Sequence, residues 1–218
     1  MTPNHDRRNL VRLSLLAAVA ANSLSLRDAW ASSPGLLESA AAPDPAVHDF
    51  DLFFGTWSAR HRRLKEPFAD NSEWLEFEGT STMQRLLGGF GNLDDSVFYL
   101  PGGMYRGVNL RAFDAKTKTW AIWWLDVRAP HSLDAPVIGR FDNSIGTFLG
   151  DDTLRGRPIK VRHVWSRITS TSRQWEQAFS PDGGKSWETN WITHFTRTGP
   201  SHADESVAAA PGCFRLVL

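Results

Sequence analysis

The sequence predicts an all-β fold, an antiparallel up-and-down barrel of eight to ten strands. Short segments of alternating apolar and polar residues follow one another and are separated by turns rich in Gly, Asp and Pro. No stretch shows the apolar spacing of a helix of three turns. Gly55-Thr56-Trp57 opens the first segment, where Gly allows close backbone approach and Trp can plug the end of a closed sheet.

Alternation also predicts which side chains share a face. Segment 57–64 places Trp57 and His61 on one side, and segment 73–84 separates Phe77 and Met83 from a polar set, which is typical of a sheet with one solvated face. The glycine-rich stretch 86–95 is expected to form a flexible loop over one barrel end, and 150–153 is expected to form a turn. The remaining expected strands are 104–113, 121–128, 137–141, 145–149, 159–167, 173–179 and 191–197.

The two ends of the chain differ from the β-rich middle. Residues 1–31 are expected to be an export signal of the twin-arginine type, because Arg7 and Arg8 precede an apolar run, 13–26, and Ala29-Trp30-Ala31 offers a cleavage site. That run is too short and too interrupted for a membrane span of about 20 residues. We therefore expect a periplasmic or secreted bacterial protein with a linker at 32–47, a barrel domain at 48–198 and a disordered tail at 199–218.

Charge and cysteine content exclude several classes of function. The chain has 24 basic and 24 acidic residues, and the part after residue 31 carries a net charge of −2, so a nucleic-acid partner is not expected. The single cysteine, Cys213, lies in the tail. An intramolecular disulfide is therefore excluded, and a thiol nucleophile at that position is not expected.

The opening Gly55-Thr56-Trp57 resembles the Gly-x-Trp start of the lipocalin and calycin barrels, in which a basic side chain of the last strand covers the Trp. The resemblance implies that Arg197, at the end of the last expected strand, covers Trp57. Such a cation–π contact contributes roughly 0.5–2 kcal/mol. This pairing is the central structural prediction, because it requires the two ends of the β-rich region to meet.

Further segments are similar to an uncharacterised bacterial family of calycin-like domains, a resemblance that implies a fold and no reaction. It covers roughly 48–197 and includes 61–64, 105–107, 124–126, 150–153 and 173–179. Segment 180–187 resembles the Asp-box turn of sialidases and other propellers, which implies a hairpin turn. Propellers repeat this box, and the single copy argues against a propeller.

A weaker resemblance links the Gly-Thr-Trp opening to the nitrobindin haem barrels, which ligate iron through one His near the C-terminal end. It implies that His194 would be the haem ligand. Alternation places His194 opposite Arg197, so that His194 faces outward if Arg197 covers Trp57 from inside. Haem is thus a minor alternative and otherwise no cofactor is expected. No metal site is expected either, since His61, His163 and His194 lack zinc-ligand spacing.

Five polar residues are candidates for acid–base chemistry. Glu176 lies between Trp175 and Gln177, and an acid on an apolar sheet face is expected to have a raised pKa, as a general base requires. The alternative is an outward carboxylate paired with a cation on a neighbouring strand. Asp126 and Arg128 are expected to form an ion pair or the polar end of a pocket. The full candidate set is Glu176, Asp126 and His61 as bases, with Arg106 or Arg128 stabilising an anion.

Ten Trp and thirteen Phe in a small domain predict an aromatic-lined cavity. The expected ligand-binding side chains are Trp57, Trp123, Trp124, Trp165, Trp175, Tyr105 and His163. The leading hypothesis is that an exported barrel binds a small apolar or aromatic molecule. The alternatives are a cofactor-independent isomerase, cyclase, lyase or hydrolase in the same cavity, and a packed barrel that acts only as an interaction module.

Overall fold

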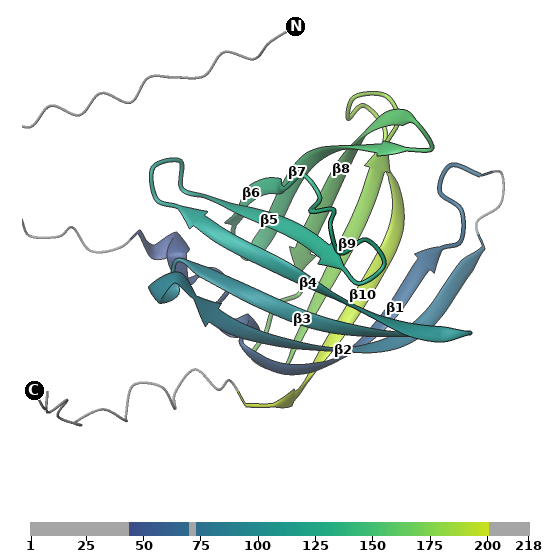
Figure 1. Ribbon diagram of the computed structural model, residues 1–218. Coiled ribbons are helices and arrows are strands. Elements are labelled where there is room, and N and C mark those ends of the chain that lie inside the picture. Colours follow the sequence, from purple (N-terminus) through teal and green to yellow (C-terminus); the bar gives the residue numbers. More distant parts are fainter. Residues whose placement is uncertain (1–43, 70–72, 201–218) are drawn as a thin grey trace, which may run out of the picture. The chain divides into compact units, whose positions relative to one another are not determined.

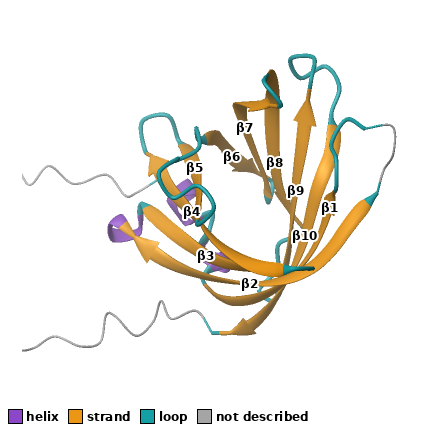
Figure 2. Ribbon diagram, turned by 45° about the vertical axis from the view of Figure 1, so that its right-hand side comes forward, coloured by secondary structure: helices purple, strands orange, loops and turns teal. Residues whose placement is uncertain are grey.

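Ten strands, each hydrogen-bonded to the next along the chain, form a closed antiparallel barrel in the computed structural model, which describes residues 44–69 and 73–200 (Figures 1 and 2). The first strand pairs with the last, with Trp57 opposite Arg197. The predicted up-and-down barrel is therefore confirmed. The strands are β1 (Gly55–Leu64), β2 (Trp74–Leu86), β3 (Gly91–Leu100), β4 (Gly103–Asp114), β5 (Thr119–Asp126), β6 (Val137–Asp142), β7 (Ile145–Leu154), β8 (Arg157–Ser166), β9 (Ser172–Ser180) and β10 (Glu188–Gly199).

Side-chain alternation sorts the residues between the interior and the solvent as predicted. In β2, Phe77, Gly79, Ser81 and Met83 are buried, while the residues that alternate with them are exposed. His61 of β1 also points inward and is only 5% exposed. Strands with one buried and one solvated face are therefore the rule in this barrel.

Helical structure among the described residues is confined to three short 3-10 turns, η1 (Pro45–His48), η2 (Asp51–Phe53) and η3 (Leu87–Gly89). In the described ranges 44–69 and 73–200, no helix has the length and apolarity needed to cross a membrane. The first two turns run beneath one end of the barrel and position the residues that close it.

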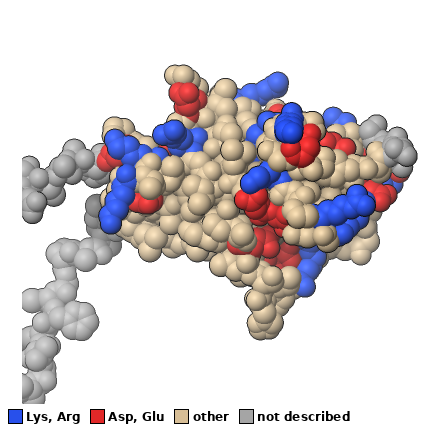
Figure 3. Space-filling view, turned by 90° about the horizontal axis from the view of Figure 1, so that it is seen from above, with Lys and Arg blue, Asp and Glu red and all other residues tan. Residues whose placement is uncertain are grey.

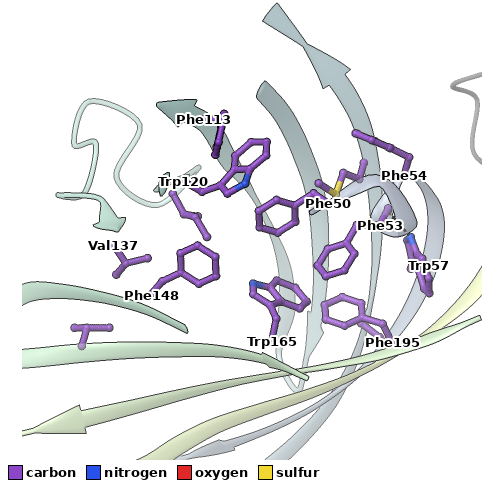
Figure 4. Packing of buried hydrophobic residues seen from close by; sticks show 14 of the residues in the cluster. Phe50, Phe53, Phe54, Trp57, Phe113, Trp120, Val137, Phe148, Trp165 and Phe195 are labelled. Carbon is purple, nitrogen blue, oxygen red and sulfur yellow. Dashed lines mark hydrogen bonds between the residues drawn. The ribbon is translucent and has the colours of Figure 1, made fainter. Parts of the chain in front are cut away.

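An aromatic plug fills this end (Figure 4). Phe50 makes edge contacts with Phe53 and Trp120, with ring centroids 5.0 and 4.9 Å apart, and Phe53 contacts Trp165 at 4.9 Å. Val47, placed in the linker by the sequence, is 5% exposed and belongs to this core, so the folded domain begins before residue 48. The predicted signal and most of the predicted linker and tail lie outside the described residues.

Trp57 is held between two guanidinium groups, which confirms the central prediction and adds to it. Arg197 lies 4.1 Å from the indole centroid and Arg173 lies 3.9 Å from it. Arg197 also donates hydrogen bonds to the carbonyl oxygens of Phe54 (2.6 Å) and Leu52 (2.7 Å). Gly55 is required beside them, because its φ is +104° and an added Cβ would lie 2.8 Å from the Arg197 guanidinium.

Two expected boundaries were wrong. The stretch 86–95 is not a loop throughout, since β3 begins at Gly91 and carries Asp94 into the interior. The predicted turn at 150–153 is part of β7, where Asp151 pairs with Lys160 and Asp152 with Ile159, and the turn follows at residues 155 and 156. In both stretches the paired strands supply interactions that override the turn preference of Gly and Asp.

The Asp-box segment forms the predicted turn between β9 and β10. The Asp182 carboxylate accepts hydrogen bonds from the backbone N–H groups of Lys185 (3.0 Å) and Ser186 (2.9 Å). Trp187 closes the turn through its indole N–H, which donates to the Gly184 carbonyl at 3.0 Å. Because these hydrogen bonds all lie within the turn, the residues of the Asp-box motif have a structural role in shaping it.

Candidate functional site

Above the aromatic plug, the barrel encloses a cavity of about 210 Å³. Its walls are largely aromatic. Asp134, Asp151 and Asp152 line it at one end and are exposed, so they mark its mouth. The aromatic wall residues are Phe98, Trp124, Trp165, Trp175, Trp191 and Phe195.

A buried ion pair contributes to the polar part of the lining. The Arg111 guanidinium lies 3.3 Å from the Asp94 carboxylate, and the two side chains are only 1% and 3% exposed. Arg111 also donates to Asn92 Oδ1 at 3.1 Å, while the hydroxyls of Ser96 (3.2 Å) and Ser81 donate to Asp94 Oδ1. Burial lowers the pKa of Arg111, and the adjacent Asp94 carboxylate opposes that effect. Each of the two buried charges therefore stabilises the other, and removing either one would leave an uncompensated charge in the interior.

His61 lines the cavity as a neutral imidazole. Burial lowers its pKa to about 3, with Arg63 adding to the effect. The Trp191 indole, which can only donate, lies 3.3 Å from His61 Nδ1, and the Thr193 hydroxyl lies 2.8 Å from the same nitrogen. Nδ1 is therefore the acceptor and Nε2 carries the proton. The ring stacks on Phe77 with centroids 4.7 Å apart.

His163, on the inner face of β8, is a second neutral imidazole. Burial lowers its pKa to about 4, partly opposed by its hydrogen bond to Gln177. The Gln177 amide donates to Asn190 Oδ1 at 2.9 Å, which leaves its oxygen to accept from His163 Nε2 at 3.1 Å. Nδ1 of His163 is thus the acceptor nitrogen of the ring.

These two histidines predict a specific pH dependence of stability. Both are neutral in the folded barrel, but in the unfolded chain they bind protons near their ordinary pKa of 6.5. We therefore expect the free energy of unfolding to fall as the pH drops from 6.5 to 4.5, by at most about 1.4 kcal/mol per pH unit for each histidine. Urea unfolding monitored by fluorescence measures this slope.

The control for this prediction is His163→Gln, which should reduce the slope by about half. Asp49 and Asp134, whose pKa values are raised by burial, act in the opposite direction near the acidic end of the range. A free energy of unfolding that stays constant between pH 6.5 and 4.5 in the natural sequence would contradict the prediction.

Two glycines make room for cavity side chains. A Cβ on Gly107 would lie 2.4 Å from the ring of Trp124, and a Cβ on Gly79 would lie 2.8 Å from Nε2 of His61. Because neither ring could keep its place beside a larger residue, the absence of a side chain at both positions shapes the cavity wall.

The structure does not bring the acid–base candidates together in the cavity. Glu176 alternates with Trp175 and Gln177, which line the cavity, so it lies on the outer face, where it accepts a hydrogen bond from Gln174. The interpretation of Glu176 as a general base in the cavity was therefore wrong. Arg106 is likewise exposed on the outside and pairs with Asp95 at 2.6 Å.

Asp126 and Arg128 form the predicted ion pair at the end of β5, with a separation of 2.5 Å. Asp126 also accepts a hydrogen bond from the Trp124 indole at 3.1 Å. The hydrogen bonds to Asp126, of which the one from Arg128 has the largest effect, lower its pKa to about 2. Arg128 lies 3.9 Å from the ring centroid of Tyr105. Both charges already have partners, and of the five acid–base candidates only His61 lines the cavity.

The predicted ligand-binding residues divide into two groups. Trp57 belongs to the plug, Trp123 lies half-buried on the outer face of β5, and Tyr105 stacks on Phe98 at 4.7 Å outside the cavity lining. Alternation explains the error for Trp123, since its neighbour Trp124 points inward. The cavity-lining members of the predicted set are Trp124, Trp165, Trp175 and His163.

The residues do not fit the haem alternative. His194 is exposed, opposite Arg60 on the outer face, as alternation predicted, so a haem bound to it would lie outside the barrel. Among residues 44–69 and 73–200, no group of three His, Cys, Asp or Glu side chains is arranged to hold a metal ion.

Comparison with known proteins gives a likeness of fold only. No family model and no curated protein matches the chain. Among solved structures, the chain is similar to the S-type phycobiliprotein lyase CPES from Guillardia theta, at 10% sequence identity and a TM-score of 0.48, over 69% of this chain and 91% of that chain.

Proposed function

We propose that the barrel binds a small, largely apolar or aromatic molecule in its interior. The observation that carries the proposal is the cavity of about 210 Å³ with indole walls and a polar floor. An apolar cavity of about 150 Å³ is large enough to bind benzene, so two fused rings are the size class that this cavity favours. His61, His163 and the Arg111–Asp94 pair supply the few polar groups that fix orientation in such sites.

The proposal includes export to the periplasm or the outside of a bacterial cell, and membership of the uncharacterised calycin-like family that the sequence resembles. The leader-like pattern in residues 1–31 supports export. The face of the barrel in Figure 3 carries basic side chains interspersed with acidic ones, in keeping with a small molecule as the partner and not a polyanion.

Purification from the native compartment tests both parts of the proposal. The mass of the mature chain reports whether the leader is removed, and mass spectrometry of released small molecules identifies an organic ligand. An absorbance scan checks for haem in the same sample. A chain that releases no organic molecule and binds no bicyclic probe would contradict the proposed function.

Two neighbouring tryptophans provide a matched test of where the ligand binds. We expect Trp124→Ala to weaken the binding of naphthalene carboxamide, a neutral bicyclic probe, by about tenfold, because it removes an aromatic wall. Trp123→Ala, one residue away on the outer face, should leave the affinity unchanged. Titration of the intrinsic fluorescence measures both, and equal losses in the two variants would place the ligand elsewhere.

A further inference from the structure

The charged side chains that line the cavity are predominantly acidic, since they comprise four carboxylates and a single guanidinium. The guanidinium, that of Arg111, is already neutralised by Asp94 in the buried ion pair. At the mouth, Asp151 pairs with Lys160 at 2.5 Å. The two cavity histidines are neutral at physiological pH, because burial lowers the pKa of each. Two carboxylates of the lining are therefore left without a counter-ion within the part of the chain that the structure describes.

These two carboxylates, Asp134 and Asp152, lie close enough to repel each other. Burial raises the pKa of Asp134, and the negative charges of Asp152 and Asp126 raise it further. Asp126 has its own counter-ion in Arg128, so the uncompensated charge at the mouth belongs to Asp134 and Asp152. A cation placed beside these two carboxylates would replace their mutual repulsion by attraction.

Indole rings adjoin the acidic mouth. The backbone N–H of Asp134 donates to the Trp124 carbonyl at 3.1 Å, which brings Asp134 beside the strand that carries this wall of the cavity. The N–H of the Trp124 indole donates to Asp126 at 3.1 Å, and that of Trp191 donates to His61 at 3.3 Å. What these two rings offer the cavity is therefore their π surface, which attracts cations as well as other rings.

From the acidic mouth and the indole walls we infer, as a refinement that rests on the proposed function, that the ligand is an organic cation, an ammonium group on an aromatic body. Its rings pack against Trp124, Trp175 and Trp191, and its positive group lies at the mouth beside Asp134 and Asp152. These two aspartates are then binding residues for the cation. Aromatic rings are a recurring means of recognising ammonium ligands, and the carboxylates add charge complementarity.

Three bicyclic probes of similar size and different charge test the inference on the full-length protein at pH 7: naphthylmethylammonium, naphthylmethanol and naphthalene carboxylate. We expect the ammonium to bind about tenfold more tightly than the neutral alcohol, and the carboxylate to bind most weakly. Because the mouth carboxylates are exposed, raising the salt concentration from about 0.05 M to about 0.5 M should reduce the advantage of the ammonium. Fluorescence titration measures the three affinities.

A pair of double variants tests where the positive group lies. Asp134→Asn with Asp152→Asn removes the uncompensated charge of the mouth, and it should lower the ammonium affinity by about tenfold while leaving the alcohol affinity unchanged. The matched control is Asp114→Asn with Asp142→Asn. It removes two exposed carboxylates next to Phe113 and Phe141, at the plugged end of the barrel, and should change neither affinity.

The possible outcomes separate this inference from the proposed function. If the alcohol or the carboxylate binds as tightly as the ammonium, the organic-cation inference is overturned and the proposed function stands. If the two double variants weaken ammonium binding equally, the overall charge of the protein attracts the probe, and the binding role of the mouth carboxylates is overturned. If none of the three probes binds, both proposals fail together. The comparison of probes on the natural sequence needs no variant, so a folding defect in a variant leaves the inference testable.

Discussion

Replacing Asp94 by Asn is expected to destabilise the barrel by about 3–5 kcal/mol, because it leaves the Arg111 guanidinium buried without a counter-ion. Both side chains are almost inaccessible to water, at 3% and 1% exposure, so solvent cannot replace the lost charge. The surrounding hydroxyls of Ser81 and Ser96 are arranged to donate to a carboxylate and do not neutralise a cation. Urea unfolding monitored by tryptophan fluorescence measures the loss.

The adjacent residue provides the matched control. Asp95 forms an ion pair with Arg106 at 2.6 Å, but on the outer face, where the two side chains are 38% and 56% exposed. Asp95→Asn should therefore cost less than about 1 kcal/mol. Similar losses for the two variants would mean that the buried pair does not contribute as proposed. A double variant, Asp94→Leu with Arg111→Met, should recover much of the stability, since apolar replacements remove both buried charges.

Trp57→Ala is expected to cost about 3–5 kcal/mol, as is typical when a large aromatic side chain is removed from a core. Trp57 is 1% exposed and donates a hydrogen bond to the Phe53 carbonyl at 2.8 Å. Its removal also takes away the aromatic surface that lies between Arg173 and Arg197. The effect is therefore expected to include loosening of the segment 44–54 from the end of the barrel.

Trp123→Ala makes the same chemical change on the outer face of β5 and should cost less than about 2 kcal/mol, because the side chain is only half-buried. Guanidinium unfolding curves give the two free energies. A loss in Trp57→Ala no larger than that in Trp123→Ala would show that the plug contributes little to stability.

The sequence predicted the barrel and most inward faces because alternation is a local property. Trp57 and His61 point inward as expected, and the Gly-x-Trp opening meets Arg197. The same alternation holds along β4, where Asn109 and Arg111, two positions apart, both line the cavity.

What the sequence did not predict depends on contacts between side chains of different strands. Asp94 lies in the glycine-rich stretch that was expected to form a flexible loop, and its buried counter-ion, Arg111, comes from the neighbouring strand β4. The role given to Glu176 was wrong for another reason, since it weighed the character of the neighbours above the alternation that places them on the opposite face. A search for an Arg on an inward face followed by a search for its buried acid would have found the floor of the cavity.

Because β1 pairs with β10, the barrel cannot close until the C-terminal strand of the domain has been synthesised. Until the last strand has been synthesised, β1 and β9 each present a row of unpaired backbone N–H and C=O groups, which are templates for pairing with other chains. Closure joins residues more than a hundred positions apart, a contact that forms slowly in folding. A nascent or truncated chain that lacks β10 is therefore expected to form an open sheet with two exposed edge strands, and not a smaller barrel.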